Sequence, residues 1–519
     1  MRFIDSYSKQ FRILRNIPSI NISFFLMCVV LIASFILRLK SVWFGYPLQL
    51  HPDEPVLVNA AQRIYSSGDL NPNNFLYPSL NIYLQATLFH VVSGCSEIVG
   101  HPWLVQEIDY YICARILNVI FSTLTIYIVY EIGRRLLSVW TGLAAVCFIS
   151  VSSLHVNNSY FATVDTSTAF WSSLTCLMAV MIYLEGCKRS LYVIGGVCAG
   201  LAIGCKYTAF PAFFPILVVH IYNVKYARCR LSENIFVSIS SLTVAFIVST
   251  PFAILDFNNF ISYIVFQRNA YMGHPGAETA TNTSFVQYFN FIIDGYGGLP
   301  LILALLGVVR LFIKNSSKAL LLLSFPAALF ILYGSFKVHF LRNVVPIIPF
   351  LSLLSGYAIS SIAELKITPL SSSFKSFKYL TIMSAIFITL MCINKQVAVD
   401  LRVAKNNSIP DTRWVSMKWI RENIPSGVTI NREAYTPPVE KLSQYIVKQL
   451  GLNAFKNNNY ADYIILSSAV FLRYTEHAER YPTEAAAYKQ FFDNHELLKE
   501  FIGDGVTTSG PTIRIYKTN

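Results

Sequence analysis

The sequence has 519 residues, of which 54% are hydrophobic and only 13% are charged. So apolar a composition over this length excludes a water-soluble globular protein and predicts a polytopic α-helical membrane protein. The net charge of +13 would suit nucleic-acid binding, but the lysines and arginines lie in short runs at the ends of apolar segments. This is the positive-inside pattern of membrane proteins, and it excludes a nucleic-acid-binding stripe.

The N-terminus is predicted to be cytosolic and anchored. Residues 1–19 are basic, and the apolar run 20–40 is long for a signal-peptide core and ends without a small-residue cleavage site. We expect it to be a retained first span that delivers His51–Pro55 to the outer side. Residues 41–110 then form a first outer loop. Its apolar part, 75–94, is predicted to lie on the outer surface, because a crossing there would place the later basic clusters outside.

Apolar segments predict about eleven membrane spans in a transmembrane domain over residues 1–395. They cover residues 20–40, 112–132, 140–154, 166–184, 190–204, 208–223, 233–255, 297–313, 319–334, 343–361 and 379–394. An odd number of spans puts the C-terminus outside. Residues 396–519 are charged and alternate short strand and helix patterns, so we expect a small extracytoplasmic α/β domain there. Its predicted elements are helices ending at 423 and covering 484–495, and strands at 428–431, 463–466 and 512–516.

Two adjacent carboxylates, Asp53 and Glu54, stand where the chain leaves the first span. Charged residues at a membrane surface are costly, which favours a functional role for this pair. Asp53 is also suited to be the N-cap of a helix that Glu54 and Pro55 open and that runs to about Ser66. One residue can serve as both a cap and a catalytic base, so both interpretations stay open.

Further ionisable residues fall on the same predicted side although they are far apart in the sequence. They are Asp165, Lys206, Arg268, His274, Lys337, His339 and Arg342. Glycosyl transfer from a lipid phosphate fits this set, because phosphate departs without a general acid. The reaction then needs one carboxylate to take the proton of the acceptor hydroxyl, and fixed cations to hold the phosphate. A base opposite the leaving group would invert the anomeric carbon.

Each of these candidates also has a structural alternative. Lys206 is placed to snorkel to the membrane interface, and Arg342 to act as a topological anchor. Asp165 is placed to cap the helix that follows it. His274 lies in a Gly-His-Pro-Gly turn, and Arg115 is placed to pair with a loop carboxylate.

The predicted chemistry requires no cofactor. A divalent metal held by Asp53, Glu54 and His274 is compatible with these residue types, but no ligand spacing demands it. The ten cysteines form no CxxC motif and no Cys/His zinc pattern.

A set of short motifs follows one order along nearly the whole chain. The motifs are Asp53-Glu54, YPSLxxYL from Tyr77, Ala114–Leu117, Tyr130–Arg135, Asp165, Gly200–Lys206, RNVVPIIP from Arg342, Thr412-Arg413 and Trp419–Gly427. This ordered set resembles the C-type, polyprenyl-phosphate-sugar-dependent glycosyltransferases, which include the protein O-mannosyltransferases and the lipid A aminoarabinose transferases. The resemblance implies a base at Asp53, with Glu54 beside it.

The resemblance also implies that Arg115, Lys206 and Arg342 contact the donor phosphate. To these phosphate contacts we add Arg268, and we assign other substrate contacts to Asp165, His274, His339 and Tyr77. The chain departs from its relatives in three respects. It has Leu76–Ser79 where the aminoarabinose transferases carry Glu-Lys-Pro-Pro, Asn343 replaces the usual Tyr after the late Arg, and no insert matches the mannosyltransferases' β-trefoil. We therefore do not assign a protein acceptor.

The predicted function is transfer of a sugar, with inversion, from a polyprenyl-phosphate donor to a hydroxyl of a glycan, lipid or protein on the extracytoplasmic face. Short loops and compact size favour a bacterial inner membrane. A transporter or flippase of lipid-linked saccharides is the first alternative, although it would show internal repeats. A polymerase or ligase using a polyprenyl diphosphate is the second, although it would favour Arg-rich outer loops without an early Asp-Glu pair.

Overall fold

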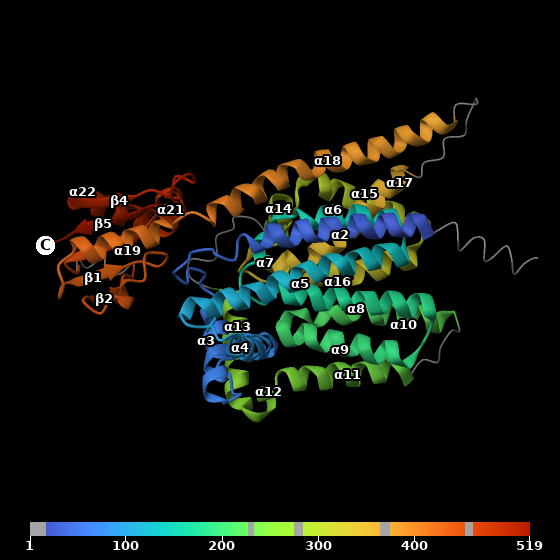
Figure 1. The fold of residues 1–519 in the computed structure, drawn as a ribbon, viewed down its shortest axis with the longest axis horizontal. Coiled ribbons are helices and arrows are strands. Elements are labelled where there is room, and N and C mark those ends of the chain that lie inside the picture. Colours follow the sequence, from blue (N-terminus) through green and yellow to red (C-terminus); the bar gives the residue numbers. More distant parts are fainter. Residues whose placement is uncertain (1–16, 227–232, 274–283, 364–373, 452–459, 519) are drawn as a thin grey trace, which may run out of the picture. The chain divides into compact units, whose positions relative to one another are not determined.

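The computed structural model describes residues 17–226, 233–273, 284–363, 374–451 and 460–518. The chain folds as two compact units. The first contains Met1–Val42 and Asp53–Leu401, and the second contains Trp43–Pro52 and Arg402–Asn519. The first unit is a bundle of helices, and the second is built around a β-sheet (Figure 1).

The predicted polytopic helical fold is confirmed. The helices are α2 (Ile17–Leu39), α3 (Glu54–Ser67), α4 (Leu80–Val99), α5 (Glu107–Leu136), α6 (Val139–Ser150), α7 (Ser153–Ser159), α8 (Asp165–Glu185), α9 (Arg189–Cys205), α10 (Phe214–Lys225), α11 (Glu233–Ser249), α12 (Phe252–Leu255), α13 (Phe257–Met272), α14 (Ser284–Tyr296), α15 (Gly298–Lys314), α16 (Ser316–Gly334), α17 (Ile348–Ala363) and α18 (Phe374–Asn406), with 3-10 helices η1 (Tyr207–Phe213) and η2 (Leu341–Ile347). Each segment predicted to span falls on one of these helices or on two consecutive ones.

The number of spans differs somewhat from the predicted eleven. Among the described residues, eight helices are long and apolar enough to cross a membrane, or up to ten if each of two bent helix pairs is one span. The bent pairs are α6 with α7, at 63°, and α14 with α15, at 112°. Helices α9 and α11 are apolar, and hydropathy therefore predicted them to be spans. Both are too short to be included among these eight to ten.

The apolar segment predicted to lie on the outer surface is mostly helix α4, which begins at Leu80 and ends at Val99. By length and composition α4 would qualify as a span. In Figure 1, however, α4 is seen nearly end-on, whereas α5, α8 and α9 run across the view. The helix therefore lies crosswise to the bundle, which is the orientation expected for a segment on a membrane surface.

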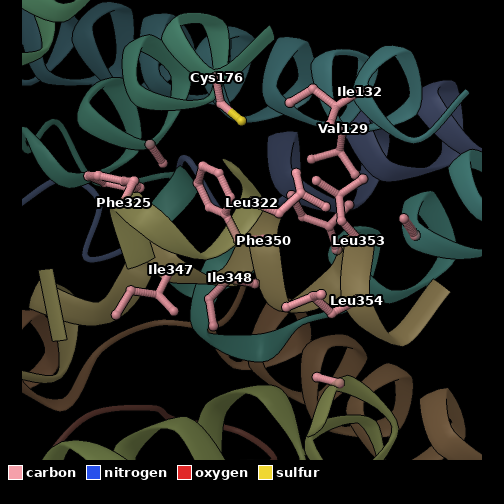
Figure 2. Packing of buried hydrophobic residues seen from close by; sticks show 14 of the residues in the cluster. Val129, Ile132, Cys176, Leu322, Phe325, Ile347, Ile348, Phe350, Leu353 and Leu354 are labelled. Carbon is pink, nitrogen blue, oxygen red and sulfur yellow. The ribbon is translucent and has the colours of Figure 1, made fainter. Parts of the chain in front are cut away.

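The bundle core is apolar and tightly packed. Val129 of α5, Phe325 of α16 and Phe350 of α17 belong to one cluster of buried side chains (Figure 2). Glycines allow some helices to approach more closely still. A Cβ atom added at Gly196 or Gly200 of α9 would lie 2.1 or 2.3 Å from a carbonyl oxygen of α11. Small residues at such crossings allow helices to pack closely in a lipid environment.

The second unit contains a mixed five-stranded sheet of order β2-β1-β3-β5-β4, as the predicted α/β domain requires. The strands are β1 (Thr429–Arg432), β2 (Ile446–Gln449), β3 (Tyr463–Ser467), β4 (Glu496–Phe501) and β5 (Ile513–Lys517), and the helices are α19 (Thr412–Asn423), η3 (Val439–Lys441), α21 (Ser468–Thr475) and α22 (Pro482–Asn494). Strands β2, β1 and β3 are parallel, and β5 is antiparallel to both β3 and β4. The sequence did not predict β2 and β4, because these edge strands are largely exposed and lack an alternating apolar pattern.

A buried carboxyl group, that of Glu433, follows β1 in this unit. Only 3% of Glu433 is exposed. Its Oε2 accepts a hydrogen bond from the backbone N–H of Ser467 at 3.1 Å, and its Oε1 accepts one from the Tyr488 hydroxyl. Burial raises the pKa of Glu433 to about 7, although the bonds from Tyr488 and Ser467 favour the ionised form.

We expect the second unit to lose stability as the pH rises towards neutrality. The unfolded chain releases the Glu433 proton near its ordinary pKa of 4.5, whereas the folded unit keeps it to about 7. The stabilisation is therefore complete below the lower value and is lost across this interval, by about 3 kcal/mol in total. The measurement is the free energy of unfolding of this unit as a function of pH. The full chain is unfolded in urea at each pH, and a hydrogen-exchange pulse at one fixed pH then reports the unfolding of β1 and β3. Glu433→Gln should flatten this pH dependence, and an equal slope in both proteins would contradict the effect.

Candidate active site

Four charged side chains of alternating sign form one continuous ion-paired chain in the first unit. The Arg342 Nη1 atom lies 2.7 Å from Asp53 Oδ2, and its Nε atom lies 4.0 Å from Asp165 Oδ2. The Lys206 Nζ atom lies 2.7 Å from Asp165 Oδ1. The side chains of Asp165 and Lys206 are 1% and 8% exposed, whereas those of Asp53 and Arg342 are 22% and 25% exposed. The chain thus runs from a buried pair to an accessible pair.

All four residues stand where a helix begins, ends or changes type. Asp53 precedes α3, and Asp165 is the first residue of α8. Lys206 is the extended residue between α9 and η1, and Arg342 lies in η2. Backbone dipoles favour negative charge at helix N-termini and positive charge after a C-terminus, so both acids and Lys206 are stabilised where they lie.

Capping does not account for the two carboxylates. Asp53 occupies the N-cap position of α3, as predicted, but its side chain makes no capping hydrogen bond. Asp165 lies one position inside α8, after the N-cap residue Val164. Both carboxylates instead contact cations, so their electrostatic partners, and not the helix ends, determine their direction.

The Lys206 ammonium is held by a second, uncharged partner. The side-chain oxygen of Asn343 accepts a hydrogen bond from Lys206 Nζ at 2.8 Å, and the Asn343 amide donates to the Tyr288 hydroxyl at 2.9 Å. The Tyr333 ring centroid lies 5.5 Å from the same Nζ atom. In the sequence, Asn343 stands out only as a departure from the expected Tyr. Its position next to Arg342 was the one signal that could have revealed its role.

Two predicted substrate residues, Tyr77 and His339, lie beside this cluster. Burial raises the pKa of the Tyr77 hydroxyl, and the nearby charges of Arg342 and Asp53 act on it in opposite directions. The His339 ring packs edge-on against Tyr288, with centroids 5.5 Å apart, and its Nε2 atom lies 2.7 Å from the Ser284 hydroxyl. Burial lowers the pKa of His339. These side chains therefore add aromatic and neutral polar groups next to the charges.

Glu54 and Arg115 form a separate, fully buried ion pair. Arg115 Nε lies 2.8 Å from Glu54 Oε1, and Arg115 Nη2 lies 2.7 Å from Oε2, so the pair is bidentate. The backbone N–H of Ala162 also donates to Glu54 Oε1, and Arg115 Nη1 donates to the Val42 carbonyl, both at 2.8 Å. Neither side chain is exposed. The pair joins α3 to α5, as the structural alternative for Arg115 supposed, and it holds the residue after Asp53 in place.

The remaining predicted positions are less closely tied to this cluster. Arg268 is exposed on α13, which has no buried residue. His274 lies outside the described residues. In the part of the chain that the structure describes, no three His, Cys, Asp or Glu residues are grouped to hold a metal ion. Both Glu54 oxygens already accept bonds from Arg115, so this carboxylate does not fit the metal site considered from the sequence.

Comparison with known proteins supports the same class of fold. Residues 109–254, which include Arg115, Asp165 and Lys206, match the family described as dolichyl-phosphate-mannose-protein mannosyltransferase. No curated protein sequence matches the chain.

Two solved structures resemble most of the chain. The first is ArnT from Cupriavidus metallidurans bound to undecaprenyl phosphate, with a TM-score of 0.54 and 13% identity over 94% of this chain and 97% of that chain. The second is the oligosaccharyltransferase of Archaeoglobus fulgidus in its apo form, with a TM-score of 0.56 and 12% identity over 88% of this chain and 72% of that chain. The chain is therefore similar to the C-type membrane glycosyltransferases, in fold over nearly its whole length and in sequence over residues 109–254, and the predicted resemblance is confirmed.

Proposed function

We propose that the protein transfers a sugar from a polyprenyl-phosphate donor to an acceptor hydroxyl, with inversion at the anomeric carbon. The observation that carries this proposal is the ion-paired chain from Asp53 through Arg342 and Asp165 to Lys206. It combines a partly exposed carboxylate with two cations at one end of a membrane bundle. A glycosyl transfer that has a phosphate leaving group needs this inventory.

The two cations are suited to hold the departing phosphate. An ammonium group has three N–H donors, and Lys206 directs two of them to Asp165 and Asn343. Among the described residues this leaves a third donor for a ligand. Arg342 is more exposed and can contact a phosphate in bidentate fashion. Asp165, predicted to contact substrate, would then act as a positioning residue, because its two oxygens face the two cations.

Asp53 is suited to be the base, and its contact with Arg342 suggests how the donor activates it. A lipid phosphate that binds Arg342 competes with Asp53 for the same guanidinium, since both are anions. The carboxylate is then released to accept the hydroxyl proton as the acceptor oxygen bonds to the anomeric carbon. The bond from that carbon to the phosphate oxygen breaks, and its electron pair stays on the phosphate. The additional negative charge that develops there is stabilised by Arg342 and Lys206.

The proposed donor follows from what the matching family and the ArnT structure have in common. The matching family is described as using dolichyl-phosphate mannose, and ArnT is described as bound to undecaprenyl phosphate, so a polyprenyl phosphate is the common part. The acceptor is a hydroxyl of a glycan, lipid or protein. We place the reaction on the extracytoplasmic face, because the charge bias puts the basic helix ends in the cytosol. Short loops and compact size favour a bacterial inner membrane.

Replacement of Asp53 tests the base directly. Asp53→Asn should lower kcat for transfer by about 10²- to 10⁴-fold, because the amide cannot accept the hydroxyl proton. Donor affinity should be kept or slightly increased, because Arg342 no longer pairs with a carboxylate. The measurement is turnover and donor Kd of the reconstituted protein with a panel of polyprenyl-phosphate sugars. Asp69→Asn, an exposed acid in the same outer loop, is the matched control. Full turnover in Asp53→Asn would remove the base assignment.

Replacement of Asn343 tests how the Lys206 ammonium is positioned. Asn343→Leu removes the acceptor at 2.8 Å but keeps the bulk, and should weaken donor binding by about tenfold, as expected for loss of one hydrogen bond to a charged group. Asn343→Asp should restore an acceptor for Lys206. Donor Kd and kcat are measured for each variant. A residue that positions Lys206 should alter donor Kd selectively, whereas a residue that only supports the fold would not. Equal donor Kd in Asn343→Leu and the wild type would contradict the role.

The buried pair of Glu54 and Arg115 should support stability and not chemistry. Glu54→Gln or Arg115→Leu leaves one buried charge without its partner and should destabilise the protein by about 3–5 kcal/mol. Replacing both residues by leucine should recover much of this loss. Thermal unfolding in detergent measures the effect, with Arg342→Gln in the more exposed pair as a milder control. A loss of turnover in Glu54→Gln without any loss of stability would instead indicate a catalytic role.

A further inference from the structure

A groove of about 450 Å³ lies between α15 and α17. Its walls are apolar side chains, such as Leu306 and Val309 of α15 and Ile362 of α17, together with the cations Arg310 and Lys314. This volume is within the range of about 300–1,000 Å³ that is usual for small-molecule sites. The combination of an apolar wall and two cations is typical of sites for amphiphilic anions.

Two buried polar atoms in this groove have no hydrogen-bond partner within the described part of the chain. Among the described residues, the Nε atom of Arg310 and the hydroxyl of Ser361 make no hydrogen bond, although both atoms are inaccessible to solvent. Ser361 as a whole is only 3% exposed. Buried polar groups are normally satisfied, so these two atoms point to a ligand that is not part of the protein.

The groove lies at the basic end of the bundle, away from the ion-paired chain. Lys314 ends α15, and Lys318 just after it donates to the carbonyl of Leu136 at the C-terminal end of α5. The same end of α5 carries Arg134 and Arg135, which the positive-inside rule places in the cytosol. Arg310 and Lys314 are four residues apart, and so lie on one face of the helix near the level of lipid headgroups.

We propose that this groove binds one anionic phospholipid of the leaflet at the basic end of the bundle. The lipid phosphate contacts Arg310 and Lys314 and accepts a hydrogen bond from Ser361, and one acyl chain lies along the exposed side chains of Leu306 and Val309. A free phosphate ion would leave the apolar wall unused. The inference does not depend on the proposed function, because the two sites are at opposite ends of the bundle.

Native mass spectrometry of the full chain in detergent, titrated with dioleoyl phosphatidylglycerol or dioleoyl phosphatidylcholine, tests the proposal. The first lipid bound should prefer phosphatidylglycerol by about tenfold or more, since each basic residue near the surface contributes about fivefold. Arg310→Gln and Lys314→Gln should each reduce this preference by about fivefold. Ala358→Leu, which fills the groove without removing charge, should weaken the binding of both lipids.

The control is Lys225→Gln, which removes a cation at the end of α10 that does not line the groove. It should leave the first binding step unchanged. Equal affinity for the two lipids in the wild type would overturn the proposal, and so would an equal loss in Lys225→Gln and Lys314→Gln. A polyprenyl phosphate that binds this groove more tightly than phosphatidylglycerol would also overturn it. If a variant does not fold, the preference of the wild-type protein for phosphatidylglycerol over phosphatidylcholine still decides the proposal.

Discussion

The constraint on which the rest of the structure depends is that a backbone in lipid must satisfy its own hydrogen bonds. Helices meet this requirement along their length, whereas breaks between helices are tolerated only where protein or a water-filled cavity surrounds them. Asp53, Asp165, Lys206 and Arg342 all stand at such places. The bundle brings these helix ends together, and so collects the charges at one end.

The alternation of charge along this chain has consequences for the chemistry. In the proposed reaction, a phosphate that binds Arg342 would displace Asp53, because the Asp53 contact is the more exposed end of the ion-paired chain. Asp165 and Asn343 hold Lys206 from two sides, so its ammonium is oriented before any ligand binds. Such preorganised charges need little rearrangement when negative charge develops, which is a main source of catalytic power in enzymes.

The structural relatives share this architecture at 12–13% identity, which is enough to establish the fold but not the substrates. The family pattern over residues 109–254 covers Asp165 and Lys206 but neither Asp53 nor Arg342. For Asp53 and Arg342, the accessible pair of the ion-paired chain, the evidence is therefore their geometry. One fold can host many functions, so the acceptor follows from the chemistry of the site and not from the fold.

Composition and local periodicity by themselves determined that this is a membrane protein, where its apolar helices lie, and that an α/β domain follows them. These properties follow from short stretches of chain, and so the sequence predicts them well. Only the tertiary structure decided which partner each charge has. Asp53 and Glu54 are neighbours in the sequence, yet Asp53 pairs with Arg342 while Glu54 pairs with Arg115 inside the protein. The partner of a buried charge comes from a distant helix, and no local pattern encodes that contact.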